Sequence, residues 1–159
     1  MVAAAASPPP ACEVWFYHLE RASPEAVLAD LLEKTLARGW KARIQCASPE
    51  RMEEIDRRLW ADRPEAFLPH GMEDEADAER QPILLGLTDE NPNGAHALFL
   101  MDGAEAPPLE GYARCIDLFD GGDPAQVQAA RERWRAVKAT GLPMSYWRQS
   151  EAGRWEKQA

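Results

Sequence analysis

The hydrophobic positions near the start of the chain change from a strand-like run to a helical spacing. EVWFYHL, residues 13–19, is a short aromatic and β-branched run of the length that a buried strand takes. In the next stretch, Ser23 suits a helix N-cap and Pro24 the first helical turn. From there to Gly39, apolar residues recur on one helical face. The pattern therefore predicts a strand over 13–19 that leads directly into a helix ending before Gly39.

The same succession recurs immediately downstream. ARIQCA, residues 42–47, predicts a second strand, and Ser48 and Pro49 repeat the N-cap and the first-turn proline. The buried stripe of this second helix is predicted to comprise Met52, Ile55 and Leu59 and to run up to Trp60. Two strand-then-helix units in succession favour a parallel sheet with right-handed crossovers.

Three more strands and one more helix are predicted in the second half of the chain. The strand candidates are PILLGL at 82–87, AHALFLM at 95–101 and YARCIDL at 112–118. The last helix is predicted over 124–140, entered through Asp123 and stopped by Gly141. Together these elements predict a three-layer α/β/α, Rossmann-like domain with a mostly parallel sheet of about five strands.

The two ends of the chain differ in composition from the periodic segments. Residues 1–11 are rich in alanine, serine and proline and lack the features of a signal peptide, so we expect a flexible leader. A single domain is predicted over 12–148, and 149–159 is predicted to be a frayed C-terminal tail in which Trp155 has no assigned role. No stretch approaches the roughly 20 apolar residues of a membrane span, so no membrane partner is expected.

Cysteine and histidine usage indicates neither a disulfide framework nor a metal site. The three cysteines, Cys12, Cys46 and Cys115, are odd in number, far apart and free of any CxxC spacing. They lie in or beside apolar runs, where a free cysteine is usually a small buried hydrophobe. The histidines have no metal-ligand spacing among themselves. We therefore expect no metal and a location in the reducing cytoplasm.

The charge balance limits the partners. With 27 acidic and 18 basic residues, the formal net charge is −9. Because phosphate binding needs a basic face, both a general nucleic-acid coat and direct DNA binding are disfavoured. An anionic partner has to be met by a local basic cluster.

Catalytic and nucleotide-binding motifs are absent from the sequence. The turn after the first strand, HLERASPEA, contains no glycine, whereas a pyrophosphate site needs glycines so that backbone amides can approach the phosphates. No GxxxxGK[ST], GxSxG or HExxH occurs, so we predict no cofactor and no catalytic residue. The alternative is a small α/β enzyme or nucleotide-binding protein that uses Asp102 and Asp117, near predicted strand ends.

Two segments remain without a role in the predicted core. RLWADRPEAFLPH, residues 58–70, places Trp60 and Phe67 on a proline-interrupted loop, where they either form a binding patch or fold back onto the second helix. The last helix carries Trp134 in its apolar stripe, as an expected core anchor. Arg131, Arg135 and Lys138 lie on an adjacent face of that helix, where such charges are usually only solvated.

These segments carry a family resemblance. LWADRPEAFLPH, AARERWRAVKATGLP and NPNGAHALFL resemble the chi subunits of the bacterial DNA polymerase III holoenzyme, over roughly 12–148 and in the same order. The resemblance implies a Rossmann-like fold without enzymatic activity. It also implies two partners: the psi subunit, which connects to the clamp loader, and the acidic C-terminal tail of single-stranded-DNA-binding protein.

The resemblance assigns these partners to particular residues. The psi interface falls on Trp60, Phe67, Leu68 and Pro69. The tail-binding arginine falls on Arg131 of ARERW, and Phe119 falls on an apolar residue of the same pocket. Where the best-studied family members have a lysine one turn before this arginine, the chain has Val127, so Arg135, one turn onward, is expected to supply part of the charge. Lys138 completes the predicted tail-binding set. An arginine fork beside an apolar pocket suits a carboxylate-ended ligand with acidic residues upstream.

The sequence thus predicts a non-catalytic replication adaptor that links the clamp loader to single-stranded-DNA-binding protein.

Overall fold

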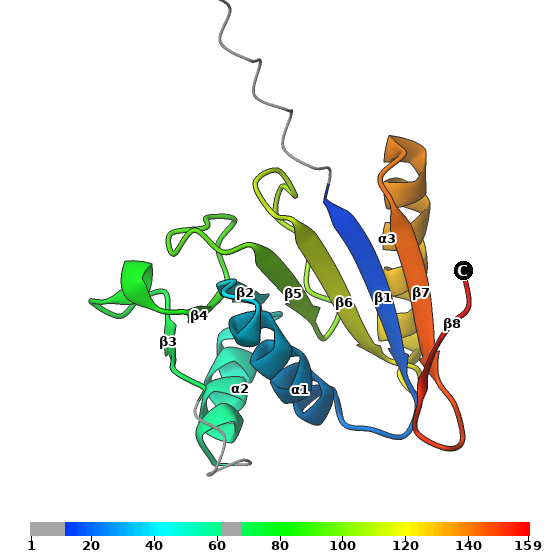
Figure 1. Ribbon diagram of the computed structural model, residues 1–159, viewed down its shortest axis with the longest axis horizontal. Helices are drawn as coiled ribbons and strands as arrows, with labels where there is room; N and C mark the ends of the chain where they lie inside the picture. The colour runs from blue at the N-terminus through cyan, green and yellow to red at the C-terminus, as the bar shows by residue number, and fades with distance from the viewer. Residues whose placement is uncertain (1–11, 62–67) are drawn as a thin grey trace, which may run out of the picture.

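The computed structural model describes residues 12–61 and 68–159, which form an α/β domain around one sheet (Figure 1). The strands are β1 (Glu13–Leu19), β2 (Ala42–Gln45), β3 (His70–Met72), β4 (Ile83–Gly86), β5 (Ala97–Met101), β6 (Arg114–Asp120), β7 (Met144–Gln149) and β8 (Trp155–Lys157). The helices are α1 (Pro24–Ala37), α2 (Pro49–Ala61) and α3 (Pro124–Thr140), with a short 3-10 turn, η1 (Ala78–Arg80).

The sheet has eight strands in the order β3-β4-β2-β5-β6-β1-β7-β8. Every neighbouring pair is parallel except β7 and β8, which are antiparallel. The predicted α/β class and mostly parallel sheet are therefore confirmed, whereas the count of about five strands was too low. β3 and β8 have three residues each, too few for a hydrophobic period, and β7 follows the glycine that ends α3.

The segment 149–159 contains regular structure and is not the frayed tail expected from the sequence. β8 pairs with β7, Trp147 lying opposite Lys157 and Gln149 opposite Trp155. The Trp155 ring packs edge-on against Tyr17, with the ring centroids 4.9 Å apart. Trp155 therefore anchors β8 to the sheet, a role that the local sequence did not reveal.

Local capping explains why the helices begin and end close to the predicted residues. The Ser23 hydroxyl accepts a hydrogen bond from the Ala26 amide at 3.2 Å, and the Asp123 carboxylate accepts from the Ala125 amide at 3.0 Å. Gly141 ends α3 with a φ of 80°, a conformation that favours glycine. The three predicted helices are therefore confirmed.

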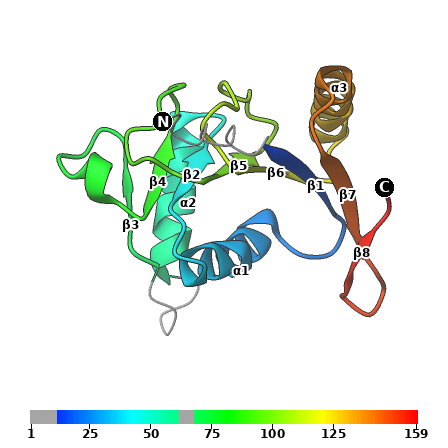
Figure 2. The same ribbon diagram turned by 45° about the horizontal axis from the view of Figure 1, so that its top comes forward.

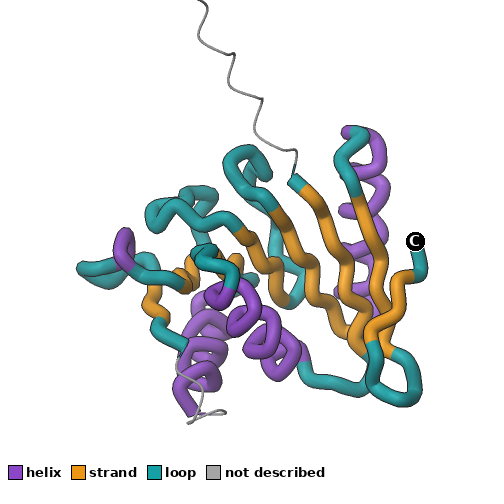
Figure 3. Tube along the Cα trace, in the orientation of Figure 1, coloured by secondary structure: helices purple, strands orange, loops and turns teal. Residues whose placement is uncertain are grey.

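Helices cover both faces of the sheet, which gives the predicted three layers. α1 and α2 lie on one face and α3 on the other (Figure 2), and the tube view shows the strands as one continuous layer between them (Figure 3). β1 contributes to both cores because its side chains alternate: Val14 and Phe16 face α3, and Tyr17 and Leu19 face α1.

All three cysteines are free and buried, as the sequence predicted. Burial raises the pKa of the Cys12 thiol to about 11 and that of Cys46 to about 12. Burial also raises the pKa of Cys115 well above its ordinary value. The thiols are therefore protonated at neutral pH and act as small apolar side chains.

Candidate functional site

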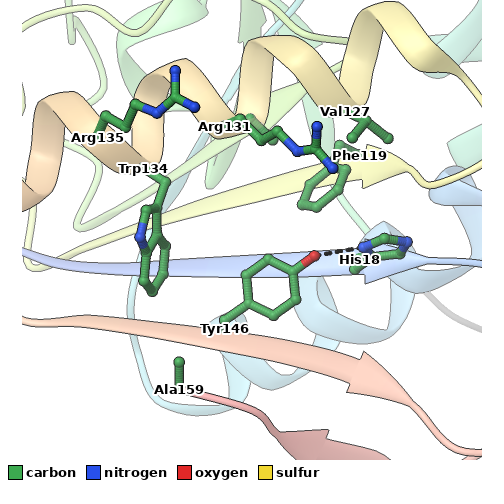
Figure 4. A pocket seen from close by; sticks show the side chains of 9 residues that line it. His18, Phe119, Val127, Arg131, Trp134, Arg135, Tyr146 and Ala159 are labelled. Atoms are coloured by element: carbon green, nitrogen blue, oxygen red, sulfur yellow. Dashed lines mark hydrogen bonds between the residues drawn. The ribbon is translucent and has the colours of Figure 1, made fainter.

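A pocket of about 420 Å³ lies between α3 and the strands β1, β6 and β7 (Figure 4). It is lined by His18, Phe119, Val127, Ala130, Arg131, Trp134, Arg135, Tyr146 and Ala159. We call it the α3 pocket.

One face of α3 forms the upper wall of this pocket. Val127, Ala130, Arg131 and Trp134 follow the spacing i, i+3, i+4 and i+7, so their side chains share one side of the helix. The position of the helix is set by a buried ion pair between Arg133 and Asp117 of β6. Arg133 also donates a hydrogen bond to the Ala104 carbonyl at 2.5 Å.

The strands supply an aromatic floor. His18 on β1 lies opposite Phe119 on β6 in the parallel register, and their ring centroids are 5.0 Å apart. Tyr146 on the neighbouring strand β7 is 6.2 Å from Phe119 and 5.9 Å from Trp134 between ring centroids. The rings enclose an apolar cavity whose walls come from three strands and one helix.

A hydrogen bond joins two polar groups of this floor. The His18 Nδ1 and Tyr146 Oη atoms are 2.5 Å apart, and the dashed line in Figure 4 marks their hydrogen bond. Burial lowers the pKa of His18, and the Arg148 guanidinium lowers it further. Burial also raises the pKa of Tyr146. At neutral pH both groups are therefore uncharged, and the tyrosine hydroxyl donates to the imidazole when the imidazole proton is on Nε2.

The charge of the α3 pocket comes from the helix. Arg131 and Arg135 are exposed at its rim, and within the described residues neither has an ion-pair partner. A guanidinium can hold a carboxylate with two parallel hydrogen bonds. The pocket can therefore take a carboxylate at its rim and an apolar side chain against its aromatic floor.

The structure brings most of the predicted tail-binding residues together. Phe119, Val127, Arg131 and Arg135 all line the α3 pocket, whereas Lys138 is exposed outside it, almost one turn beyond Arg135. Trp134 is both the expected core anchor and a pocket wall, since it packs on Phe16 with centroids 5.2 Å apart.

Sequence reasoning did not find His18, Tyr146 or Ala159 as pocket residues. The alternation of the first strand could have placed His18 on the same face as Phe16. Tyr146 lies on a strand that was not predicted, and Ala159 reaches the site because its main-chain oxygen accepts a hydrogen bond from the Tyr146 amide at 3.1 Å.

The residues of the predicted psi interface lie in different environments. Trp60 is 53% exposed, and its ring packs at a tilt against that of His70 with centroids 4.1 Å apart. Leu68 is only 3% exposed and belongs to the core beneath α1 and α2. Pro69 is partly exposed, and Phe67 lies outside the described residues.

His70 supports this segment from within. It is buried, and its ring nitrogens lie 2.7 Å from the Leu68 carbonyl oxygen and 3.1 Å from the Asp56 carbonyl oxygen. It is therefore a structural hydrogen-bonding residue on which Trp60 rests.

The carboxylates of the alternative enzymatic site are both engaged in ion pairs. The Asp102 carboxylate accepts from Arg51 Nε at 2.8 Å, and Arg51 also binds Glu25 and Glu54. Asp117 is 1% exposed and pairs with Arg133, and burial raises its pKa. These ion pairs connect helices to the sheet, so both carboxylates have structural partners and do not line a ligand pocket.

Neither a metal site nor a membrane-spanning helix is found among the described residues. Between 12–61 and 68–159, no cluster of three or more His, Cys, Asp or Glu side chains has the arrangement of a metal site. No helix in these ranges has the length and apolar character to cross a bilayer.

The fold and the site define an α/β domain with an arginine–aromatic pocket between its third helix and the sheet. The chain belongs to the DNA polymerase III chi subunit family: the family model "DNA polymerase III chi subunit, HolC" matches residues 12–145. The chain is 37% identical to DNA polymerase III subunit chi of Pseudomonas aeruginosa over 134 residues, which cover 81% of this chain and 91% of that protein. It is 28% identical to DNA polymerase III subunit chi of Haemophilus influenzae over 122 residues, or 76% and 84% of the two chains.

Proposed function

We propose that this chi-family protein is a non-catalytic replication adaptor that works in the cytoplasm. It binds the acidic C-terminal tail of single-stranded-DNA-binding protein in the α3 pocket, and it joins that protein to the clamp loader through psi or an equivalent subunit. The observation that carries the proposal is the convergence of Phe119, Val127, Arg131 and Arg135 on one cavity.

The chemistry of the α3 pocket suits the end of an acidic tail. We assign the terminal carboxylate to Arg131, because this residue lies on the helix face that closes the aromatic cavity. The last side chain of the tail then lies against Phe119, Tyr146 and Trp134. Acidic residues upstream pass Arg135 and Lys138, whose exposed charges act over a longer distance and are screened by salt.

Val127 changes the balance between charge and apolar contact. In this chain it lines the cavity where the family resemblance leads us to expect a lysine. Its side chain adds apolar surface but no positive charge, so Arg131 and Arg135 carry the electrostatic attraction at the rim.

The clamp-loader contact is proposed for the surface around Trp60. Its exposed ring is held in place by His70, so little conformational entropy is lost when a partner covers it. Pro69 lies at the edge of this surface, and Leu68 supports it from the core. Because α2 and α3 cover opposite faces of the sheet, both partners can bind at once (Figure 2).

The enzymatic alternative has no comparable support, because Arg51 and Arg133 already pair with its candidate carboxylates.

A pull-down tests the tail-binding part of the proposal. Immobilised single-stranded-DNA-binding protein should retain the chain, and the same protein without its C-terminal tail should not. Equal retention by both forms would exclude the tail as the binding element.

A further inference from the structure

A second cationic pocket lies on the opposite face of the sheet from the α3 pocket. Because β1 side chains alternate, Trp15 and Tyr17 face α1, whereas Phe16 and His18 face α3. Beneath the last turns of α1 these two rings border a cavity of about 300 Å³, together with Lys34, Arg38, Trp40 and Arg114. We call it the α1 pocket.

Aromatic rings hold the two guanidiniums of this pocket. The Arg114 Cζ atom is 3.9 Å from the centroid of the Trp15 ring and 5.3 Å from that of Trp40. The Arg38 Cζ atom is 4.1 Å from the centroid of Trp40. Cation–π attraction holds each guanidinium over a ring, and its terminal N–H groups remain able to donate to an acceptor.

The positive charge of the α1 pocket is not neutralised within the described residues. Lys34, Arg38 and Arg114 have no ion-pair partner there. The Glu13 carboxylate attracts Arg114 from a distance, while it accepts a hydrogen bond from Trp15 Nε1 at 3.2 Å. This local excess of cations occurs in a chain whose formal net charge is −9.

Arg114 has properties that a purely structural role does not explain. Its Nε atom is buried without a hydrogen-bond partner. Burial lowers its pKa, and the like charge of Arg38 lowers it further. Lys34 and Arg38 belong to the end of α1, where cations complement the helix dipole, whereas Arg114 is brought to the same place from β6. An anion between Arg38 and Arg114 would remove their repulsion.

We infer that the α1 pocket binds an acidic peptide segment through its side-chain carboxylates. A carboxylate accepts from the N–H edges of Arg114 and Arg38, and a neighbouring apolar side chain lies against Tyr17 and the α1 residues beside it. A peptide fits better than a nucleic acid, because Trp15 and Trp40 already contact Trp147 and His96 as well as the arginines. Less ring surface is therefore left for stacking a base.

This site does not depend on the α3 pocket, and a suitable probe separates the two. The probe is a short fluorescent peptide of aspartates around one leucine, with an acetylated N-terminus and an amidated C-terminus, so that it offers no terminal carboxylate. We expect it to bind the wild-type chain more weakly as salt rises. Arg114→Ala should weaken binding about tenfold or more, and Arg131→Ala should weaken it less than Arg114→Ala does.

Matched variants keep the test independent of folding. Arg38→Ala, at the exposed end of α1, should also weaken binding of the peptide. Arg80→Ala removes the same charge from the exposed turn η1 and should leave peptide binding unchanged. The indole N–H signals of Trp15 and Trp40 should shift in NMR spectra at lower peptide concentrations than that of Trp134. Melting curves of each variant establish that it is folded.

Three results would overturn the inference: no binding of the peptide to wild type, unchanged binding by both Arg38→Ala and Arg114→Ala, or loss of binding in Arg131→Ala alone. Binding of single-stranded oligothymidine in place of the peptide, lost in Arg114→Ala, would identify the site as one for nucleic acid and would also overturn it.

Discussion

At the scale of single residues, the α3 pocket separates charge from apolar contact. Arg131 and Arg135 stand at the rim, while Phe119 and Tyr146 form the floor. A charged hydrogen bond at the rim and a ring contact at the floor contribute to binding in different ways, since salt screens only the first.

The test ligand is an acidic peptide with a free C-terminal Pro-Phe. Of the three substitutions, Arg131→Ala should weaken its binding most, by about 1.5–3 kcal/mol, because a hydrogen bond to the terminal carboxylate is lost. Arg135→Ala and Lys138→Ala should each cost under about 1 kcal/mol, since their charges are solvated. Fluorescence anisotropy of the labelled peptide measures the affinity of each variant and so the order of the three effects.

Amidating the peptide should have the same effect as Arg131→Ala, and the two changes together should cost little more than either alone. Full affinity in Arg131→Ala would show that the assignment is wrong.

His18 should make the stability of the domain depend on pH. Its pKa is lowered from its ordinary value by burial and by Arg148, so the unfolded chain takes up a proton at a higher pH than the folded chain does. The free energy of unfolding should therefore fall as pH drops below about 6.5, and this loss should continue down to the folded pKa. Urea melts at several pH values measure it.

His18→Gln removes the titrating imidazole and serves as the control for wild type. The carboxylates titrate alike in both proteins, so a difference in the pH dependence of their stability reports on His18. The gap in stability between wild type and His18→Gln should narrow or reverse as the pH falls. A gap independent of pH would contradict the prediction.

At the scale of elements, α3 depends on one buried ion pair. Asp117 on β6 is almost fully buried, and Arg133 is its partner from the helix. Arg133→Met should destabilise the domain by about 3–5 kcal/mol, because an uncompensated carboxylate remains in the core. Chemical denaturation measures the loss.

The double variant Asp117→Leu, Arg133→Met should recover most of this stability, since no buried charge is left. Arg135→Met, an exposed substitution on the same helix, should change stability by less than about 0.5 kcal/mol. A mild effect of Arg133→Met alone would show that the pair does not hold α3 to β6.

β8 is held by a ring contact as well as by its ladder. Trp155→Ala should cost about 1–2 kcal/mol, less than a fully buried tryptophan, because its ring is half-buried against Tyr17. Hydrogen exchange should quicken at the Gln158 amide, which donates to the Tyr146 carbonyl at 2.7 Å. Lys157→Ala, an exposed neighbour in β8, should leave the exchange rate unchanged. Equal exchange in the two variants would mean that the ring does not anchor β8.

At the scale of the whole molecule, the sheet separates two proposed partners. Trp60→Ala should leave stability within about 1 kcal/mol, because the ring is exposed. It should abolish binding to the clamp-loader side and leave the tail peptide bound as before. Arg131→Ala should show the opposite pattern. If either variant lost both partners while remaining folded, the two surfaces would not be independent.

Much of the fold was predictable because it depends on short-range chemistry. Ser23, Asp123 and Gly141 set helix ends through contacts within a few residues, and the runs at 13–19, 82–87 and 95–101 are apolar enough to mark buried strands. The strands with weak local patterns, β3, β7 and β8, were not predictable, because their stability comes from pairing with neighbours.

The sequence by itself determined the layer order, the excess of acidic charge and the helix face that carries Arg131 and Arg135. Only the tertiary structure decided that His18 and Tyr146, 128 positions apart, share a hydrogen bond in the same pocket. It also decided that Arg114 lies between Trp15 and Trp40 on the other face. The physical reason is that a strand's pattern specifies which side chains share a face, whereas the neighbours of that face are set by the order of strands in the sheet.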